Sequence, residues 1–166
     1  MKNSILPIAI FIITLISSPK LAAQEFRGLD KSPMDMAAFP SSYRISDKIV
    51  KVIYSRPQLK GRDLVKLAPP EKVWRTGANE AVEITFYKDV IFGGKSVKAG
   101  TYSLFAIPSS EKDWTIIINS AQNVWGSYYY KQDQDVVRVS GITSKADKNI
   151  EAFSMMFDDD MTLKMG

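Results

Sequence analysis

Alternation of apolar and polar residues with a period of two recurs along the chain, and it constrains the fold more than any other feature. Residues 81–87 (A-V-E-I-T-F-Y) alternate valine, isoleucine and phenylalanine with glutamate and threonine. Successive side chains of a strand point to opposite faces of a sheet, so this pattern predicts a strand with one buried face. The chain is therefore expected to form mainly β-structure.

Other segments rich in Val, Ile, Tyr, Phe and Thr extend this prediction. They favour strands over residues 48–54, 101–107, 114–119, 135–142, 150–157 and 161–165. Gly93-Gly94 predicts a hairpin turn between residues 90–92 and 95–97. Only residues 62–67, which are followed by two prolines, favour a short helical turn. Short strands, frequent turns and few helices indicate an all-β fold, either an antiparallel β-sandwich or a compact barrel-like domain.

The first 23 residues have the features of a secretory signal peptide. Lys2 gives a positively charged start, residues 5–16 are almost all apolar, and Leu21-Ala22-Ala23 offers a cleavage site. The apolar run is shorter than the ~20 residues that span a bilayer, so no permanent membrane anchor is expected after cleavage. We therefore expect an exported protein, periplasmic or secreted, with residues 24–31 as a flexible lead-in and residues 32–166 as a single β domain. The chain ends within a strand-like pattern, which suggests that a C-terminal strand is missing.

The chain contains no cysteine and no histidine, which narrows its chemistry. Thiol mechanisms, imidazole acid–base catalysis and zinc sites built from Cys or His are excluded. The formal net charge is +4, and Lys2 and Lys20 of the leader contribute to it, so the rest of the chain is only mildly basic. This charge gives no reason to expect nucleic acid as a partner, and no cofactor is expected.

The densest group of polar residues lies between residues 54 and 80. Arginine is a planar, bidentate donor suited to carboxylate, phosphate or sulfate groups, and tryptophan can stack on a flat ring or a cation. A site for an anionic or carbohydrate-like ligand is one interpretation of this group. Its candidate ligand-binding residues are Tyr54, Arg56, Lys60, Arg62, Trp74, Arg75, Asn79 and Glu80.

The same group also admits a structural interpretation. Arg56 or Arg75 would pair with Glu80 and hold an irregular loop to the sheet, because long polar crossings between strands need partners for their backbone groups. Gly77 is expected to provide a turn with positive φ or a close approach between backbones. On this interpretation, replacing Trp74 or Arg75 with alanine would strongly destabilise the protein.

Several strings in this region resemble an uncharacterised family of exported bacterial proteins, domain of unknown function 2911. They are Y-S-R-P at residues 54–57, K-G-R at 60–62 and V-W-R-T-G-A-N-E-A at 73–81. The strings K-A-G-T-Y-S-L-F-A-I-P at 98–108, W-T-I-I-I-N at 114–119 and N-V-W-G at 123–126 continue the resemblance. The resemblance implies a β-rich domain with one further C-terminal strand. It brings no known activity, substrate or catalytic residue with it.

Two functions remain open. The first is a non-catalytic exported binding domain for a small-molecule ligand, a glycan or a protein partner. The second is a small, glycosidase-like hydrolase based on two carboxylates, with Glu80 as one of them and the second unassigned. The first is favoured because the chain offers so few catalytic side chains.

Two short runs have simpler explanations. Asp158-Asp159-Asp160 lacks the alternating acids and the glycine of a calcium loop, so we expect a solvated turn between strands and no metal site. The three tyrosines at residues 128–130 are either an exposed contact surface or a strand that buries alternate rings, and partial burial is favoured.

Overall fold

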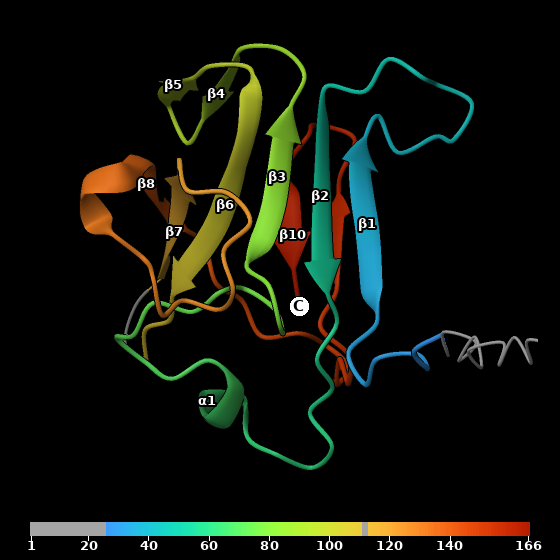
Figure 1. Cartoon of the computed structure of the whole chain (residues 1–166), viewed down its shortest axis with the longest axis vertical. Coiled ribbons are helices and arrows are strands. Elements are labelled where there is room, and N and C mark those ends of the chain that lie inside the picture. Colours follow the sequence, from blue (N-terminus) through green and yellow to red (C-terminus); the bar gives the residue numbers. More distant parts are fainter. Residues whose placement is uncertain (1–25, 111–112) are drawn as a thin grey trace, which may run out of the picture.

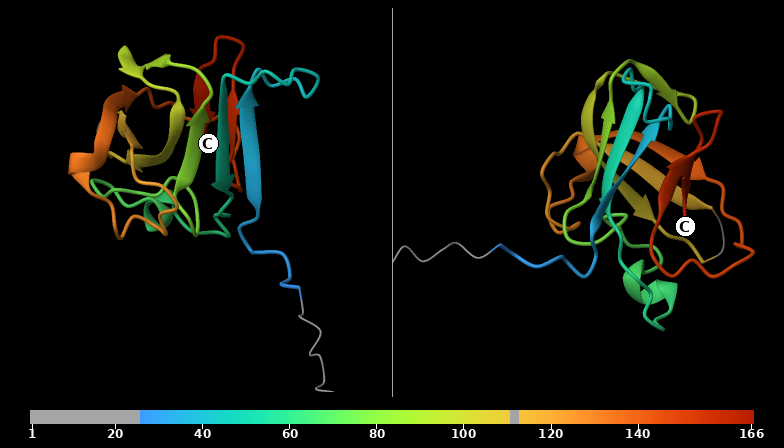
Figure 2. Two further views of the ribbon diagram at one scale, coloured as in Figure 1. Left: turned by 45° about the horizontal axis from the view of Figure 1, so that its top comes forward. Right: turned by 90° about the vertical axis from the view of Figure 1, so that its right-hand side faces the viewer.

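The computed structural model describes residues 26–110 and 113–166. The predicted signal peptide over residues 1–23 lies outside the described residues. Residues 26–31 form no helix or strand and are exposed, and they lead away from the domain in Figures 1 and 2. In the described part of the chain, no helix is long and apolar enough to cross a membrane.

One six-stranded antiparallel sheet forms the body of the domain (Figure 1). Along this sheet the strands follow the order β1-β2-β3-β6-β7-β8, so every neighbour except the β3–β6 pair is also consecutive in the chain. The strands are β1 (Met34–Phe39), β2 (Val50–Ser55), β3 (Val82–Phe86), β6 (Gly100–Ile107), β7 (Trp114–Asn119) and β8 (Asp135–Gly141). The predicted mainly β, antiparallel fold is confirmed.

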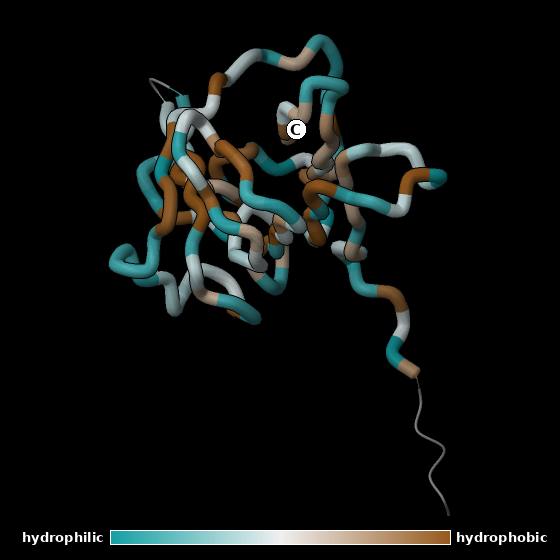
Figure 3. Tube along the Cα trace, turned by 90° about the horizontal axis from the view of Figure 1, so that it is seen from above, coloured by the Kyte–Doolittle hydropathy of each residue, from teal (hydrophilic) through white to brown (hydrophobic). Residues whose placement is uncertain are grey.

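Two hairpins accompany the large sheet, and the core lies on the face that they cover (Figure 2). They are β4 (Val90–Phe92) with β5 (Lys95–Val97), and β9 (Met155–Phe157) with β10 (Leu163–Met165). Alternation directs Val52, Ile84, Leu104 and Ile118 into this core, where each is almost fully buried. In Figure 3 hydrophobic segments gather in the body of the domain, and many of the segments at its edge are hydrophilic.

The short helical elements match the few helix signals of the sequence. Helix α1 (Leu64–Leu67) lies in the segment predicted to form a helical turn, and it ends just before the two prolines, which cannot continue it. A 3₁₀ turn, η1 (Gln132–Gln134), immediately precedes β8.

Two strands differ from the prediction for tertiary reasons. Strand β1 has the sequence M-D-M-A-A-F, which has low strand propensity, but pairing with β2 along its whole length makes it a strand. In contrast, only the last three residues of the predicted strand over 150–157 form β9. The preceding residues instead bond to an irregular loop, through Leu59 N to the Glu151 carbonyl at 2.9 Å and Phe153 N to the Pro57 carbonyl at 2.9 Å.

The opposite, outer face of the sheet is covered over only one half. The loop over residues 120–134 covers β6 and β7, where the ring of Tyr130 packs edge-on against Phe105 at 5.2 Å. The Tyr130 hydroxyl donates to Asp135 at 2.7 Å, and burial together with this carboxylate raises the pKa of Tyr130. Over β1 and β2 the outer face stays open, with Met34 and Met36 exposed. The edge of the loop therefore forms a step on the sheet.

Tyr54 provides a pH-dependent link between β2 and β9. Its hydroxyl accepts from Met155 N at 2.9 Å and donates to the Met155 carbonyl at 3.3 Å, and burial raises the pKa of this hydroxyl. Tyr54→Phe is expected to lower the free energy of unfolding by about 1–3 kcal/mol at neutral pH, because two buried backbone groups lose their partner.

A group whose pKa is raised by folding stabilises fully below its unfolded pKa and loses that contribution as the pH rises through the folded value. The difference between wild type and Tyr54→Phe should therefore shrink above a pH of about 10. Urea unfolding of both proteins at neutral and alkaline pH measures it, and a difference that stays constant with pH would contradict this role.

Candidate functional site

The predicted ligand-binding cluster separates into residues of the core, residues of a peripheral loop and residues beside a pocket. Tyr54 and Trp74 belong to the core and are almost fully buried. The Trp74 ring packs edge-on against Trp114 at 6.2 Å and against Phe153 at 5.2 Å. Neither ring is available as a stacking platform for a ligand.

Arg56 is occupied by contacts within the protein. Its Nε donates to the Phe153 carbonyl at 2.9 Å, its Nη2 to Ser154 Oγ at 2.7 Å, and its Nη1 pairs with Asp35 at 3.0 Å. The expected pairing of Arg56 or Arg75 with Glu80 is wrong, because no salt bridge among the described residues includes Glu80. Arg56 does hold an irregular segment to the sheet, as expected of an arginine, but the carboxylate that pairs with it belongs to Asp35 of β1.

Lys60 and Arg62 lie in an exposed loop and do not line the pocket. Arg62 donates to the carbonyls of Leu59 at 2.9 Å and Gln58 at 2.6 Å, which stabilises the turn before α1. The backbone N–H of Lys60 donates to Glu151 Oε1 at 2.7 Å. These two residues are therefore not part of the pocket that Glu80 lines.

Residues 74–80 (W-R-T-G-A-N-E) form a connection that pairs with β6 at one end and with the outer loop at the other. Trp74 exchanges two backbone hydrogen bonds with Ala106 of β6, at 2.7 and 3.0 Å. Positive φ occurs at Thr76 and Asn79, and Gly77 instead allows a close approach, since a Cβ there would lie 3.0 Å from the Ser55 carbonyl oxygen. Thr76 is fully buried, and its hydroxyl donates to the Trp74 carbonyl at 3.3 Å.

Glu80 forms an isolated antiparallel pair with Trp125 of the outer loop. Two hydrogen bonds flank the pair, Ala81 N to the Val124 carbonyl at 2.9 Å and Gly126 N to the Asn79 carbonyl at 3.0 Å. Residues opposite each other between such bonds have close side chains on the same face. The pair thus places a carboxylate beside an indole that is 55% exposed.

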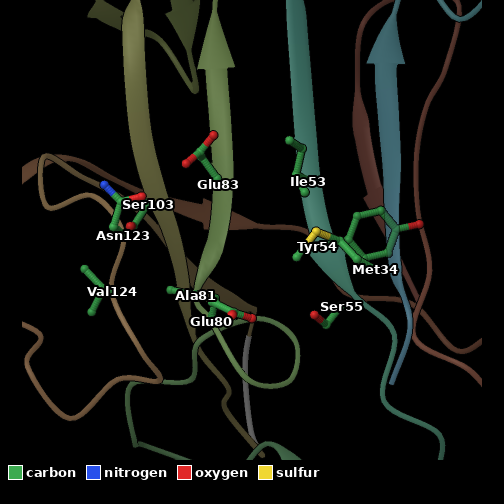
Figure 4. Close-up of a pocket in the computed structure, with 10 residues that line it drawn as sticks. All are labelled: Met34, Ile53, Tyr54, Ser55, Glu80, Ala81, Glu83, Ser103, Asn123 and Val124. Atoms are coloured by element: carbon green, nitrogen blue, oxygen red, sulfur yellow. The ribbon is translucent and has the colours of Figure 1, made fainter. Parts of the chain in front are cut away.

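A pocket of about 270 Å³ lies next to this pair, at the step between the open sheet face and the loop (Figure 4). Its polar lining consists of two carboxylates, one amide, the hydroxyls of Ser55 and Ser103, and Tyr54, whose hydroxyl is bonded to the Met155 backbone. No lysine or arginine lines it. The lining residues are Met34, Ile53, Tyr54, Ser55, Glu80, Ala81, Glu83, Ser103, Asn123 and Val124.

Sequence reasoning identified only Tyr54 and Glu80 of this lining. Glu83 was expected on the polar side of β3, and it does lie there, but that side faces the pocket and leaves Glu83 half-buried. Register explains this arrangement, because Glu83 lies opposite both Ile53 of β2 and Ser103 of β6. The alternation predicted which side each residue takes, and only the position of the loop made that side a pocket.

The tyrosine run is a turn, and the interpretation as a strand that buries alternate rings is wrong. Tyr130 is half-buried, whereas Tyr128 and Tyr129 are exposed to 77% and 74%. Together with Trp125, they are the exposed aromatic residues of this loop.

Two other places merit comparison with the pocket. A more open hollow of about 430 Å³ at the opposite end of β2 and β3 includes Lys48, whose ammonium group already bonds two carbonyls. Asp158 and Asp160 lie in the turn between β9 and β10, where Asp158 pairs with Lys164 and Asp160 accepts from Thr162 N at 2.9 Å. The described residues contain no cluster of three or more acids suited to a metal ion.

Comparison with known proteins adds the family. No curated protein and no solved structure matches this chain. The family described as "Protein of unknown function (DUF2911)" matches residues 32–166, which is nearly the whole of the described β domain. The chain therefore belongs to the DUF2911 family.

Proposed function

We propose that this protein is an exported, non-catalytic binding domain whose pocket beside Glu80 takes a neutral, hydroxyl-rich ligand such as a sugar ring. The observation that carries the proposal is the polar lining of the pocket, where Glu80, Glu83, Asn123, Ser55 and Ser103 supply acceptors and mixed donors. Sugar hydroxyls both donate and accept, so they match carboxylates, an amide and hydroxyls.

The charge of the lining favours a neutral ligand over an anion. Two carboxylates without a cation would repel a carboxylate or phosphate group and would leave it without a compensating donor charge. The anionic ligand considered from the sequence is therefore not proposed for this pocket. A cationic amine is the competing class that the same charges would accept.

Trp125 supports a ring-shaped ligand. Its indole is largely exposed and stands on the same face as Glu80. Flat aromatic surfaces contribute apolar contact area at little conformational cost, and the Glu80 carboxylate beside the indole can accept hydrogen bonds from the ring's substituents. The pocket is slightly below the roughly 300–1,000 Å³ of common small-molecule sites, which fits one ring or one unit of a chain.

The hydrolase is the second candidate, and the presence of Glu80 and Glu83 in one pocket favours it. A glycosidase needs two carboxyl groups that flank the same bond, about 5 to 10 Å apart. In Figure 4 the carboxylates of Glu80 and Glu83 point in different directions and do not face each other. This geometry supports binding over cleavage.

Glu80→Gln is expected to weaken binding of a neutral saccharide about tenfold or more, because a charge-assisted hydrogen bond is lost. Trp125→Ala should weaken it several-fold. Calorimetric titration with neutral hexoses, N-acetylhexosamines, their short oligomers, glucuronic acid and spermidine measures these effects on the purified protein. Glu71→Gln is the matched control, since Glu71 is an exposed acid outside the pocket.

Spermidine binding that depends on Glu80, with no saccharide binding, would replace the sugar by a cationic amine. Slow release of a shortened saccharide by wild type, abolished in both Glu80→Gln and Glu83→Gln, would establish the hydrolase instead. Saccharide binding unaffected by either substitution at Glu80 or Trp125 would contradict the assignment of this pocket.

A further inference from the structure

Arg75 stands apart from the other arginines of the signature. Arg56 and Arg62 use their nitrogens on carbonyls, a hydroxyl and a carboxylate of the protein. The Nε of Arg75 is buried and has no hydrogen-bond partner among the described residues. Its two terminal nitrogens have none either, but they remain accessible to solvent.

The main chain holds Arg75 firmly in this position. Its carbonyl accepts from Val82 N at 3.2 Å, at the start of β3, and the neighbouring Trp74 is paired with β6. The side chain is therefore presented from a rigid part of the fold. An arginine that leaves a fixed backbone position and already has its Nε buried loses less conformational freedom on binding a ligand than a fully exposed arginine does.

The outer loop passes directly over the guanidinium at Gly126. A Cβ at this glycine would lie 3.2 Å from Arg75 Nη1 and 2.8 Å from two ring atoms of Tyr128, and the φ of Gly126 is +67°. Only a residue without a side chain lets the loop, the Tyr128 ring and the guanidinium meet there. This closeness places one edge of the exposed Tyr128 ring beside the charge.

Within the described chain, no carboxylate neutralises Arg75. A partly buried positive charge without a partner is unfavourable, and an oxyanion that receives two parallel N–H bonds relieves it. Arg75 is not among the residues that line the pocket, and the loop residue nearest to its guanidinium is Gly126, which follows Trp125.

We propose that Arg75, with Tyr128 beside it, is an oxyanion-binding site for the carboxylate or phosphate group of a ligand. The site does not depend on the pocket beside Glu80 and stands if the proposal for that pocket fails. On this proposal Arg75 binds a ligand and does not hold the loop to the sheet.

The test is a titration of the purified, ¹⁵N-labelled protein with inorganic phosphate and, separately, with acetate at constant ionic strength. The side-chain Nε–H signal of Arg75, identified by its loss in Arg75→Met, is expected to shift in a saturable way with at least one anion. Response to phosphate alone assigns a phosphate group, and response to acetate alone assigns a carboxylate. Equal responses support a general oxyanion site.

Variants separate recognition from structure. Arg75→Met keeps the apolar stem, so it is expected to melt no lower than wild type and to bind the anion at least tenfold more weakly. Arg62→Met is the matched control and should bind as wild type does. No response of the Nε–H signal to either anion would overturn the proposal. So would a melting temperature of Arg75→Met several degrees below wild type together with anion binding that Arg75→Lys leaves intact.

Discussion

Replacing Trp74 with alanine is expected to lower the free energy of unfolding by about 3–5 kcal/mol, the range for deleting a large buried aromatic side chain. Trp74 is only 7% exposed, and its ring fills the space between Trp114 of β7 and Phe153 before β9. Removing the ring would abolish its contacts with both the sheet and the C-terminal segment. Because a domain is stable by only about 5–15 kcal/mol, this loss would remove a large part of its stability.

Thermal and urea unfolding measure this effect, with an expected drop in melting temperature of roughly 10 °C or more. Trp125→Ala is the matched control, because it removes the same side chain from an exposed position. We expect the control to melt close to wild type and to bind the saccharide several-fold more weakly. Similar melting temperatures for Trp74→Ala and wild type would mean that the ring at position 74 is not part of the core.

Replacing Asn119 with aspartate is expected to lower the free energy of unfolding by about 3 kcal/mol or more, although the two side chains have nearly the same shape. The Asn119 amide donates to the Lys131 carbonyl at 3.0 Å and to Asp135 Oδ1 at 2.8 Å, and its oxygen accepts from Ala121 N at 3.0 Å. Asn119 is fully buried. Aspartate would lose both donors and place a second carboxylate against Asp135, and unsatisfied or repelling buried groups are expensive.

The consequence should extend to the pocket, because these bonds hold both ends of the loop that carries Asn123 and Trp125. Asn119→Asp is therefore expected to weaken saccharide binding as well as stability. For stability, Asn123→Asp is the matched control, since Asn123 is exposed in the same loop and aspartate tolerates its φ of +55°. Equal stability of the two variants in urea unfolding would show that the Asn119 network does not anchor the loop.

Local alternation was sufficient to predict most of the sheet. Strands β2, β3, β6, β7 and β8 and the β4–β5 hairpin lie where period-two patterns and the Gly93-Gly94 turn predicted them. Strand β1 was not predicted, because its methionines and alanines carry no local signal and its pairing with β2 decides its conformation. Of the strand predicted over residues 150–157, only β9 and an isolated bridge from Ala152 to Gln58 are present. The reason is again tertiary, because the partner of residues 151–153 is an irregular loop.

The candidate site was predicted only in part. The sequence drew attention to Glu80, Trp74 and the arginines as one group, and the structure assigns them to different places. Trp74 packs in the core, Arg56 pairs with Asp35, and Glu80 borders a pocket with Glu83 and Asn123. Nearness in sequence grouped them, whereas the sheet face and the loop that each one reaches separate them.

The sequence by itself determined the β class, the family and the side of the sheet that each strand residue takes. The tertiary structure alone decided which polar residues share a pocket, which arginine keeps its donors unpaired and which carboxylate neutralises which cation. The physical reason is the range of the forces. Alternation and turn preference act between neighbours along the chain, whereas a pocket or an ion pair depends on segments such as β3 and the loop over residues 120–134, which only the register of the folded sheet brings together.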